Sequence, residues 1–174
     1  MVFERDLGDG LTLALRTPVL AHTVHALAAA NLDRLKLWEP WAHAFDPSGP
    51  DETWDRMQLQ EYIDKTAIPT VVMRNGRPLG AVSARIDRYT GTGSIGYWLD
   101  AAAEGQGIAQ RACRTLIDDM LSDGIARVEI RTAAHNARSI RLAERLGFER
   151  EGTLRSALPV GDERHDLAVY GLVA

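Results

Sequence analysis

Hydrophobic and polar residues follow two different periods along this chain, and the changes of period predict its strands and helices. Alternation and β-rich runs between turn residues predict strands over 11–16, 69–74, 78–86, 94–99, 127–132, 148–154 and 165–173. Helical spacing of apolar residues predicts helices over 19–32, from 51 or 52 to 65, over 108–122 and over 137–146. The Asn75-Gly76-Arg77 turn is typical of a hairpin between two of the strands.

The order of these elements predicts the fold class. The early strands follow one another as an antiparallel meander, and a β-α-β unit comes after them. Together they predict an α/β fold with a mixed sheet and helices on both faces. One helix buries the apolar stripe Ile108, Ala112, Cys113, Leu116, Ile117 and Met120. The helical spacing of a second set predicts that it also belongs to the core: Trp54, Met57, Tyr62 and Ile63.

Length and composition predict a single domain over residues 1–174. A chain of 174 residues with 45% hydrophobic content can bury a core of its own. Its net charge of −4 and its lack of a Lys/Arg run argue against nucleic acid as a partner, and the lack of a long apolar run argues against a membrane. One cysteine, a charged N-terminus and dispersed histidines predict a cytoplasmic protein without a disulfide or a metal site. Monomer and homodimer both stay open.

The segment 95–109 runs from a strand through a glycine loop into a helix. Gly105 and Gly107 let the backbone curl around an anion, and the helix that begins near Ile108 adds its N-terminal N–H groups and dipole. This predicts a pyrophosphate site. A dinucleotide fold fits poorly, because Gln110 stands where its fingerprint requires a third glycine and three strands precede the unit.

A second motif follows this loop, Asn136-Ala137-Arg138-Ser139 on a helix that ends in Leu146-Gly147-Phe148. Together with Glu104-Gly105-Gln106-Gly107-Ile108-Ala109, which falls on the phosphate-loop pattern Gln/Arg-x-x-Gly-x-Gly/Ala, it resembles the GNAT superfamily of acetyltransferases. Three further segments are similar to the RimJ/RimL group, which acetylates α-amino groups of ribosomal proteins: 37–41, 96–99 and 162–166. The resemblance covers nearly the whole chain and implies an acetyl-CoA-dependent N-acetyltransferase on the GNAT fold.

The resemblance also implies which residues meet acetyl-CoA. The backbone N–H near Leu99 would hydrogen-bond the thioester carbonyl oxygen, where an oxyanion develops. Asn136 would hydrogen-bond the pantetheine or acceptor region, and the Ser139 hydroxyl would protonate or hydrogen-bond the leaving sulfur; the alternative for both is helix capping. The backbone amides that would hold the pyrophosphate are those of Gln106, Gly107, Ile108 and Ala109.

Two positions depart from the family pattern. Ala143 stands where many members have a tyrosine as general acid, so that role passes to Ser139. Glu104 replaces the usual Gln or Arg and places a like charge near the pyrophosphate, which weakens cofactor affinity unless its carboxylate turns to solvent.

The general base stays open among Asp100, Glu144, His165, Asp166 and water. An α-amine with a pKa near 8 costs about 1.4 kcal/mol to deprotonate at pH 7, whereas a lysine costs about 4.6 kcal/mol. An α-amine acceptor therefore needs little help from a base. The His165-Asp166 pair is considered first, and its alternative is a hydrogen-bonded strand edge.

The acceptor also stays open. The segment 39–64 carries seven carboxylates against Arg56 alone, which suits either electrostatic steering of a cationic acceptor or a solvated helix face. Trp38 and Trp41 flank Pro40 and either line an acceptor pocket or plug helix ends. The sequence does not choose between a protein N-terminal amine, which the resemblance implies, and a small amine such as a polyamine or aminoglycoside. A non-catalytic acyl-CoA-binding module is a further alternative.

Overall fold

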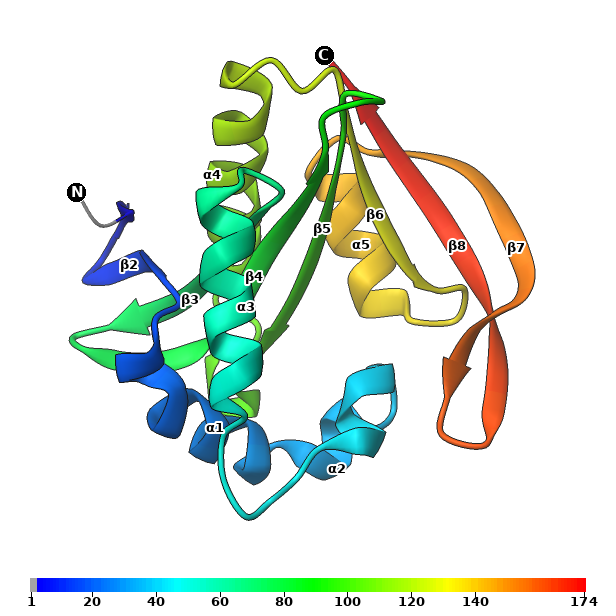
Figure 1. Ribbon diagram of the computed structural model, residues 1–174. Coiled ribbons are helices and arrows are strands. Elements are labelled where there is room, and N and C mark those ends of the chain that lie inside the picture. Colours follow the sequence, from blue (N-terminus) through cyan, green and yellow to red (C-terminus); the bar gives the residue numbers. More distant parts are fainter. Residues whose placement is uncertain (1–2) are drawn as a thin grey trace.

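The computed structural model describes residues 3–174, whose strands form one mixed eight-stranded sheet in the order β1-β2-β3-β4-β5-β6-β8-β7 (Figure 1). All neighbouring strands are antiparallel except β5 and β6. The strands are β1 (Glu4–Gly8), β2 (Leu11–Leu15), β3 (Ala67–Arg74), β4 (Arg77–Asp87), β5 (Thr92–Leu99), β6 (Arg127–Ala133), β7 (Glu149–Val160) and β8 (Glu163–Val173). The α-helices are α1 (Ala21–Ala30), α2 (Leu32–Leu35), α3 (Glu52–Ile63), α4 (Ile108–Ser122) and α5 (Ala137–Arg145).

Helices cover both faces of the sheet, as predicted. Val71 and Val72 are consecutive in β3 and therefore point to opposite faces. Val72 packs in the main core with Leu116 of α4, whereas Val71 packs with Val24 of α1. On one face α1 packs on β4 and α3 on β3, and on the other α4 packs on β4 and β5 and α5 on β6. The stripe predicted on α4 is fully buried: Ile108, Ala112, Cys113, Leu116, Ile117 and Met120.

The N-terminal half departs from the sequence prediction in two elements. The sequence did not predict β1, which precedes the first predicted strand. β1 is an edge strand that buries only Leu7, so it lacks the alternation of apolar and polar residues by which a strand is predicted. The helix predicted over 19–32 is divided into a short 3-10 helix (Pro18–Leu20), α1 and α2. The division falls at Asn31, because its side-chain amide donates to the Leu27 carbonyl at 3.0 Å and competes with the helical backbone.

The helix α3 buries a different face from the one predicted. Trp54, Met57 and Ile63 are 38%, 48% and 69% exposed, so their assignment to the core is wrong. The buried face of α3 carries Asp55 and Gln58 instead. Asp55 faces the sheet because it pairs with Arg16 at 2.8 Å, and apolar spacing cannot reveal such a buried ion pair.

The last two strands are longer than predicted. They form one hairpin that joins β7 to β8, with irregular pairing between Leu154 and Leu158. Within that interval Ser156 has a φ of 49°, and its backbone N–H donates to Asp166 at 2.8 Å. None of the helices in the described part of the chain has the length and apolar character needed to cross a membrane.

The parallel strands β5 and β6 separate, and this separation positions the site. They pair only where Thr92 to Ile95 face Arg127 to Ile130, and β6 continues along β8 (Figure 1). The Asp100 N–H donates to the Leu79 carbonyl on the β4 side, so the alternating backbone turns the N–H and C=O of Leu99 toward the gap. The end of β5 therefore has no neighbouring strand on the gap side just before the glycine loop.

Candidate active site

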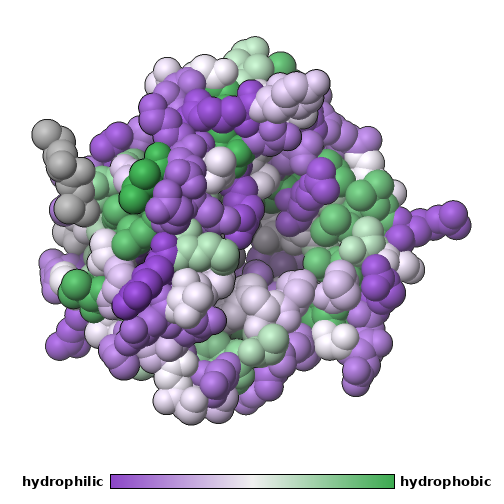
Figure 2. Space-filling view, viewed as in Figure 1, coloured by the Kyte–Doolittle hydropathy of each residue, from purple (hydrophilic) through white to green (hydrophobic). Residues whose placement is uncertain are grey.

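Two cavities meet on the face of the molecule above the end of β5. The larger has a volume of about 860 Å³ and the smaller about 360 Å³. Figure 2 shows a hollow near the middle of this face, in the region where Figure 1 places β5 between α3 and α5. Three residues line both cavities, and they mark the junction: Glu39, Tyr97 and Trp98.

The smaller cavity gathers most of the predicted cofactor residues. Gly105 and Gly107 have φ angles of 74° and 72°, a left-handed conformation that favours glycine. Gly107 is also the N-cap of α4, and the first two residues of this helix line the cavity, where its N-terminal N–H groups lack partners within the helix. Six of the seven predicted residues line this cavity: Leu99, Gly107, Ile108, Ala109, Asn136 and Ser139.

Gln106 does not line the cavity. Its side-chain amide donates to the Ala102 carbonyl at 2.9 Å, and its carbonyl oxygen accepts from Arg74 at 3.1 Å. These bonds hold the side chain on the outside of the loop. The role that the resemblance gives to the Gln106 backbone N–H stays a prediction.

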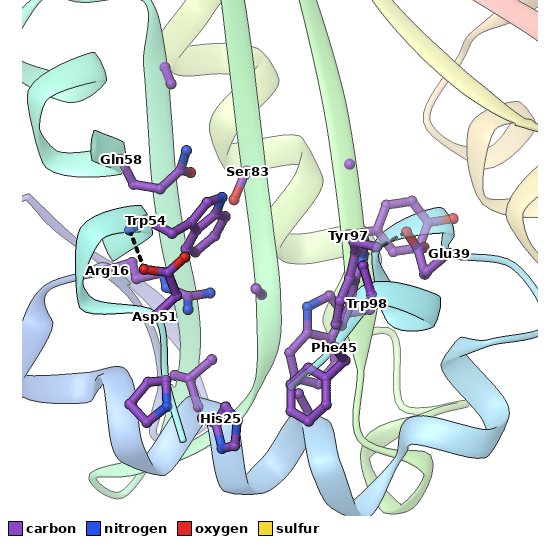
Figure 3. Close-up of a pocket in the computed structure, with 18 of the residues that line it drawn as sticks. Arg16, His25, Glu39, Phe45, Asp51, Trp54, Gln58, Ser83, Tyr97 and Trp98 are labelled. Carbon is purple, nitrogen blue, oxygen red and sulfur yellow. Dashed lines mark hydrogen bonds between the residues drawn. The ribbon is translucent and has the colours of Figure 1, made fainter. Parts of the chain in front are cut away.

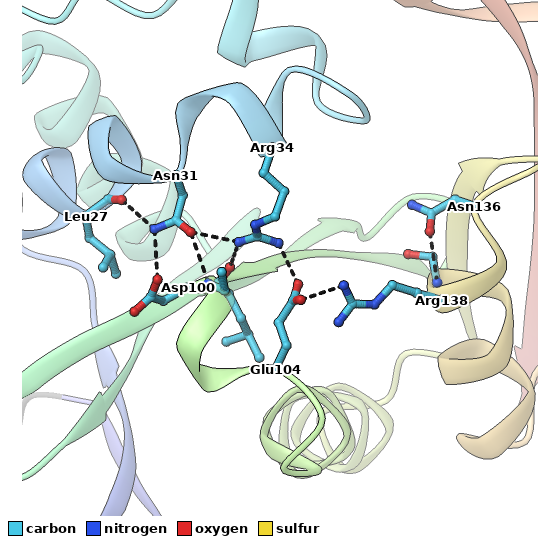
Figure 4. A network of polar contacts seen from close by, with 10 residues as sticks. Leu27, Asn31, Arg34, Asp100, Glu104, Asn136 and Arg138 are labelled. Atoms are coloured by element: carbon cyan, nitrogen blue, oxygen red, sulfur yellow. Dashed lines mark hydrogen bonds and ion pairs between the residues drawn. The ribbon is translucent and has the colours of Figure 1, made fainter.

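Glu104 takes neither of the two orientations considered for it. Its carboxylate bridges Arg34 of α2 and Arg138 of α5, at 2.5 Å each, and its side chain is 22% exposed (Figure 4). Arg34 also donates to the Leu99 carbonyl and, at 3.0 Å, to the Asn31 side chain. Two guanidinium groups therefore compensate the charge of the carboxylate, which argues against strong repulsion of a pyrophosphate; the effect of Glu104 on cofactor affinity stays a prediction.

The charge around the smaller cavity favours an anion. Four arginines line it, against the two carboxylates Glu39 and Glu104: Arg34, Arg138, Arg141 and Arg145. A cavity lined with excess positive charge attracts and retains phosphate groups. The cavity thus combines a left-handed glycine loop, a helix N-terminus and surplus guanidinium charge.

Ser139 lies beside a residue that the sequence analysis did not assign to the site. The Tyr97 hydroxyl is 2.6 Å from the Ser139 hydroxyl oxygen, which brings β5 and α5 into contact across the gap. Burial raises the pKa of Tyr97 above its ordinary value, so the phenol stays protonated at neutral pH. The pair can therefore pass a proton to an acceptor in the smaller cavity.

Asn136 does cap α5, the alternative considered for it. Its side-chain oxygen accepts from the Ser139 backbone N–H at 3.2 Å. This fixes the first turn of α5 and the direction of the Ser139 side chain, because Ser139 lies in that turn. Asn136 also lines the smaller cavity, so capping and contact with a ligand are compatible.

The larger cavity has aromatic walls (Figure 3). Trp41 packs on Trp98 and on Phe45, with ring centroids 6.1 and 6.4 Å apart, and Arg16 stacks over Trp54 at 4.4 Å. Trp41 therefore lines a pocket, one of the two roles considered for it. Trp38 lines the smaller cavity and packs on His135.

The acidic segment contributes less free negative charge to this cavity than its composition predicts. Three of its carboxylates pair with arginines, which offsets their charge, whereas three others accept hydrogen bonds from uncharged groups and keep theirs. The partners are Ser48 N–H for Asp46, the α3 N-terminus for Asp51, Arg16 for Asp55, Arg56 for Glu52, Arg85 for Glu61 and Gln60 for Asp64.

None of the four residues considered as general base lines either cavity. Asp100 accepts from the Asn31 side chain at 3.1 Å, and Glu144 is exposed. Asp166 accepts the backbone N–H of Ser156, which is the strand-edge alternative, and His165 packs against His135 with ring centroids 4.8 Å apart. Their positions give no support to a catalytic role.

Cys113 provides a test of direct transfer. Its thiol is fully buried in α4, and burial raises its pKa to about 12. A thiolate nucleophile is therefore absent at neutral pH. We expect Cys113→Ala to leave kcat and acetyl-CoA affinity unchanged and to lower the free energy of unfolding by about 1 kcal/mol. Loss of turnover in a folded Cys113→Ala protein would instead indicate an acyl-cysteine intermediate.

Comparison with known proteins agrees with this geometry. The family model described as "Acetyltransferase (GNAT) domain" matches residues 12–149. YdaF of Bacillus subtilis, provisionally named a ribosomal N-acetyltransferase, is 32% identical over 99% of this chain and 96% of its own length.

Two solved structures share the fold. RimL, a ribosomal L7/L12 α-N-protein acetyltransferase in complex with coenzyme A, has a TM-score of 0.91 at 21% identity, covering 99% of this chain and 98% of its own. The microcin C7 self-immunity acetyltransferase MccE, in complex with acetyl-CoA and AMP, has a TM-score of 0.89 at 24% identity, covering 97% and 94%. This chain belongs to the GNAT family of acetyltransferases, as its two motifs predicted.

Proposed function

We propose that the protein transfers the acetyl group of acetyl-CoA to the α-amine of a protein N-terminus, as a ribosomal-protein acetyltransferase does. The observation that carries the proposal is the junction of the two cavities at Tyr97 and Trp98. The smaller cavity has the anion-binding loop for the donor, and the larger has room for the end of a peptide chain. The full-length similarity to YdaF, and the complexes of RimL and MccE with coenzyme A and acetyl-CoA, support the same reading.

The proposed mechanism is direct transfer. A neutral amine in the larger cavity attacks the thioester carbon, and the Leu99 N–H, which faces the gap, stabilises the oxyanion. The carbon–sulfur bond then breaks, and the sulfur takes a proton from the Ser139 hydroxyl. Tyr97, at 2.6 Å, restores that proton. The products are the amide and the free thiol of CoA.

A small cationic amine is the second candidate acceptor, and the acidic segment is the feature that favours it. The larger cavity, however, is lined by as many guanidinium groups as carboxylates: Arg16, Arg85 and Arg131 against Glu39, Asp46 and Asp51. A polycation gains little from a balanced cavity. Deprotonating an α-amine at pH 7 also costs about 3 kcal/mol less free energy than deprotonating a lysine-like amine.

Release of the CoA thiol from acetyl-CoA tests the proposal. The acceptors are peptides with free N-termini, the same peptides with blocked N-termini, polyamines and aminoglycosides, with a control that has no acceptor. We expect release with the free peptides and none with the blocked ones. Faster release with polyamines or aminoglycosides would favour the small-amine function. No release with any amine, while acetyl-CoA still raises the melting temperature, would indicate a binding module.

A further inference from the structure

We propose that Glu39 is the general base that takes the proton from the acceptor amine, an inference that rests on acetyl transfer to an amine. Among the carboxylates of residues 3–174, only Glu39 lines both cavities. It shares that position with Tyr97, which contacts Ser139. A base must reach the amine nitrogen as it bonds to the thioester carbon, and this junction is where the two substrates meet.

The backbone around Glu39 fixes the direction of its side chain. Its N–H donates to the Leu35 carbonyl at 2.8 Å, and its carbonyl accepts from the Ala42 N–H at 3.1 Å. Pro40 follows and restricts Glu39 to an extended conformation, with φ −109° and ψ 112°. Figure 3 shows the Glu39 carboxylate beside the Tyr97 ring. Because hydrogen bonds fix both the N–H and the C=O of Glu39, its side chain leaves the backbone in a defined direction, toward the junction of the two cavities.

One carboxylate oxygen of Glu39 is available for an amine. The Trp41 indole N–H donates to Oε2 at 3.1 Å, and Oε1 accepts no hydrogen bond from the residues that the structure describes. Burial raises the pKa of Glu39, and the Trp41 hydrogen bond opposes that change. A higher pKa strengthens the carboxylate as a base toward the amine nitrogen.

Charged and titratable groups from several elements share the two cavities with Glu39. The neutral phenol of Tyr97 is its neighbour on β5. The others in the smaller cavity are Arg34, Glu104, Arg138, Arg141 and Arg145, and those in the larger are Arg16, His25, Asp46, Asp51, Arg85 and Arg131. No second carboxylate lies at the junction, so the pH dependence of proton removal belongs to Glu39 and to the amine.

The proton balance closes with two groups. The amine nitrogen forms the new bond to the acetyl carbon and gives one proton to the Glu39 carboxylate. The thiolate that leaves takes one proton from Ser139, which Tyr97 replaces. Glu39 then loses its proton, and Tyr97 regains one, through the open larger cavity. No other reactant is needed.

The test uses Glu39→Gln in the full-length protein, with the amine that the unmodified enzyme acetylates fastest. Glutamine keeps an acceptor oxygen for Trp41, so we expect the melting temperature and the acetyl-CoA Kd to stay unchanged. We expect kcat/KM at pH 7 to fall about 100-fold, the lower range for loss of a general base. Glu52→Gln is the matched control, because Glu52 belongs to the same acidic segment, lines neither cavity and is 72% exposed. It should keep the full rate.

The pH profile separates a base from a structural residue. In the unmodified enzyme kcat/KM falls as the pH drops through the raised pKa of Glu39, and Glu39→Gln should lose this limb. Both proteins should share a second limb, in which the rate rises about tenfold per pH unit toward the pKa of the amine, because only the neutral amine reacts. The fall with decreasing pH should therefore be steeper in the unmodified enzyme than in Glu39→Gln only below the pKa of Glu39. Glu39→Asp keeps a carboxylate, so its kcat/KM should be lower but should still fall as the pH drops through the pKa of that carboxylate. This variant replaces Glu39→Gln in the test if Glu39→Gln is unstable.

The two possible failures are distinguishable. A Glu39→Gln protein with the rate and pH profile of the unmodified enzyme would overturn the role of Glu39 alone, as would a folded Glu39→Asp protein whose profile had lost the limb. The proposed acceptor fails in a different measurement, when the unmodified enzyme acetylates small amines and not free N-terminal peptides. The Glu39 test then runs on the small amine. An unmodified enzyme without turnover on any amine would overturn both.

Discussion

Replacing Gly107 with valine is expected to weaken acetyl-CoA binding by about 100-fold. Gly107 has a φ of 72°, which costs a β-branched residue about 1–3 kcal/mol and is relieved by reshaping the loop. Reshaping would turn the backbone N–H groups away from the pyrophosphate, and the new side chain would enter the smaller cavity, which Gly107 lines. A loss of about 3 kcal/mol corresponds to roughly 100-fold in Kd, measurable by calorimetry.

Gly124 provides the matched control for this substitution. It has a φ of 87°, has open space around the position of a Cβ, and follows α4 at the end opposite to Gly107. Gly124→Val should lower the melting temperature through the same backbone strain, and it should leave the Kd for acetyl-CoA unchanged. If Gly107→Val bound acetyl-CoA as tightly as Gly124→Val, the assignment of the phosphate loop would be wrong.

The parts of the site that the sequence predicts are those formed by residues close together in the chain. The glycine loop needs only Gly105, Gly107 and the start of α4, all within one turn of one another. Asn136 and Ser139 likewise lie within one turn of α5, where the cap links them. Local spacing fixes such geometry, because backbone conformation and helix ends are local properties.

The parts that the sequence did not predict depend on contacts between distant segments. Tyr97 and Ser139 are 42 positions apart, and only the separation of β5 from β6 brings them together. Glu39 stands in a segment noted for its resemblance to one group of acetyltransferases, yet its place at the junction follows from the packing of the segment after α2 against β5. One signal was available, because Glu39 directly precedes Pro40 and is flanked by two tryptophans.

The electrostatic effect of the carboxylates near the site was the property that the sequence predicted least accurately. The sequence predicted that Glu104 repels a pyrophosphate. It could not show that Arg34 and Arg138 pair with this carboxylate, because they are 70 and 34 residues away along the chain. The carboxylates of the acidic segment likewise pair with arginines and backbone N–H groups that folding brings near. A net charge counted along the chain includes none of this pairing, whereas the electrostatic effect depends on distance and burial.

Replacing Ser139 with alanine is expected to lower kcat by about 100-fold without changing the Kd for acetyl-CoA. The Ser139 hydroxyl lines the smaller cavity, and its loss removes the proton donor for the leaving sulfur. The effect stays at the lower range for acid catalysis because a thiol with a pKa near 8.5 is a tolerable leaving group as the thiolate. Measurement of CoA release at saturating acetyl-CoA and saturating amine gives kcat, and calorimetry gives the Kd for acetyl-CoA. An unchanged kcat would remove Ser139 from the mechanism.

Tyr97→Phe shows whether the tyrosine acts through Ser139. Phenylalanine fills the same space but loses the 2.6 Å hydrogen bond, so we expect kcat to fall about tenfold, in line with a bond worth about 1.4 kcal/mol. If Tyr97 only supplies protons to Ser139, the Tyr97→Phe, Ser139→Ala double variant should be no slower than Ser139→Ala alone. Independent donors would instead multiply the two losses to about 1000-fold. The double variant therefore distinguishes a relay from two separate acids, because only a relay makes the second substitution silent.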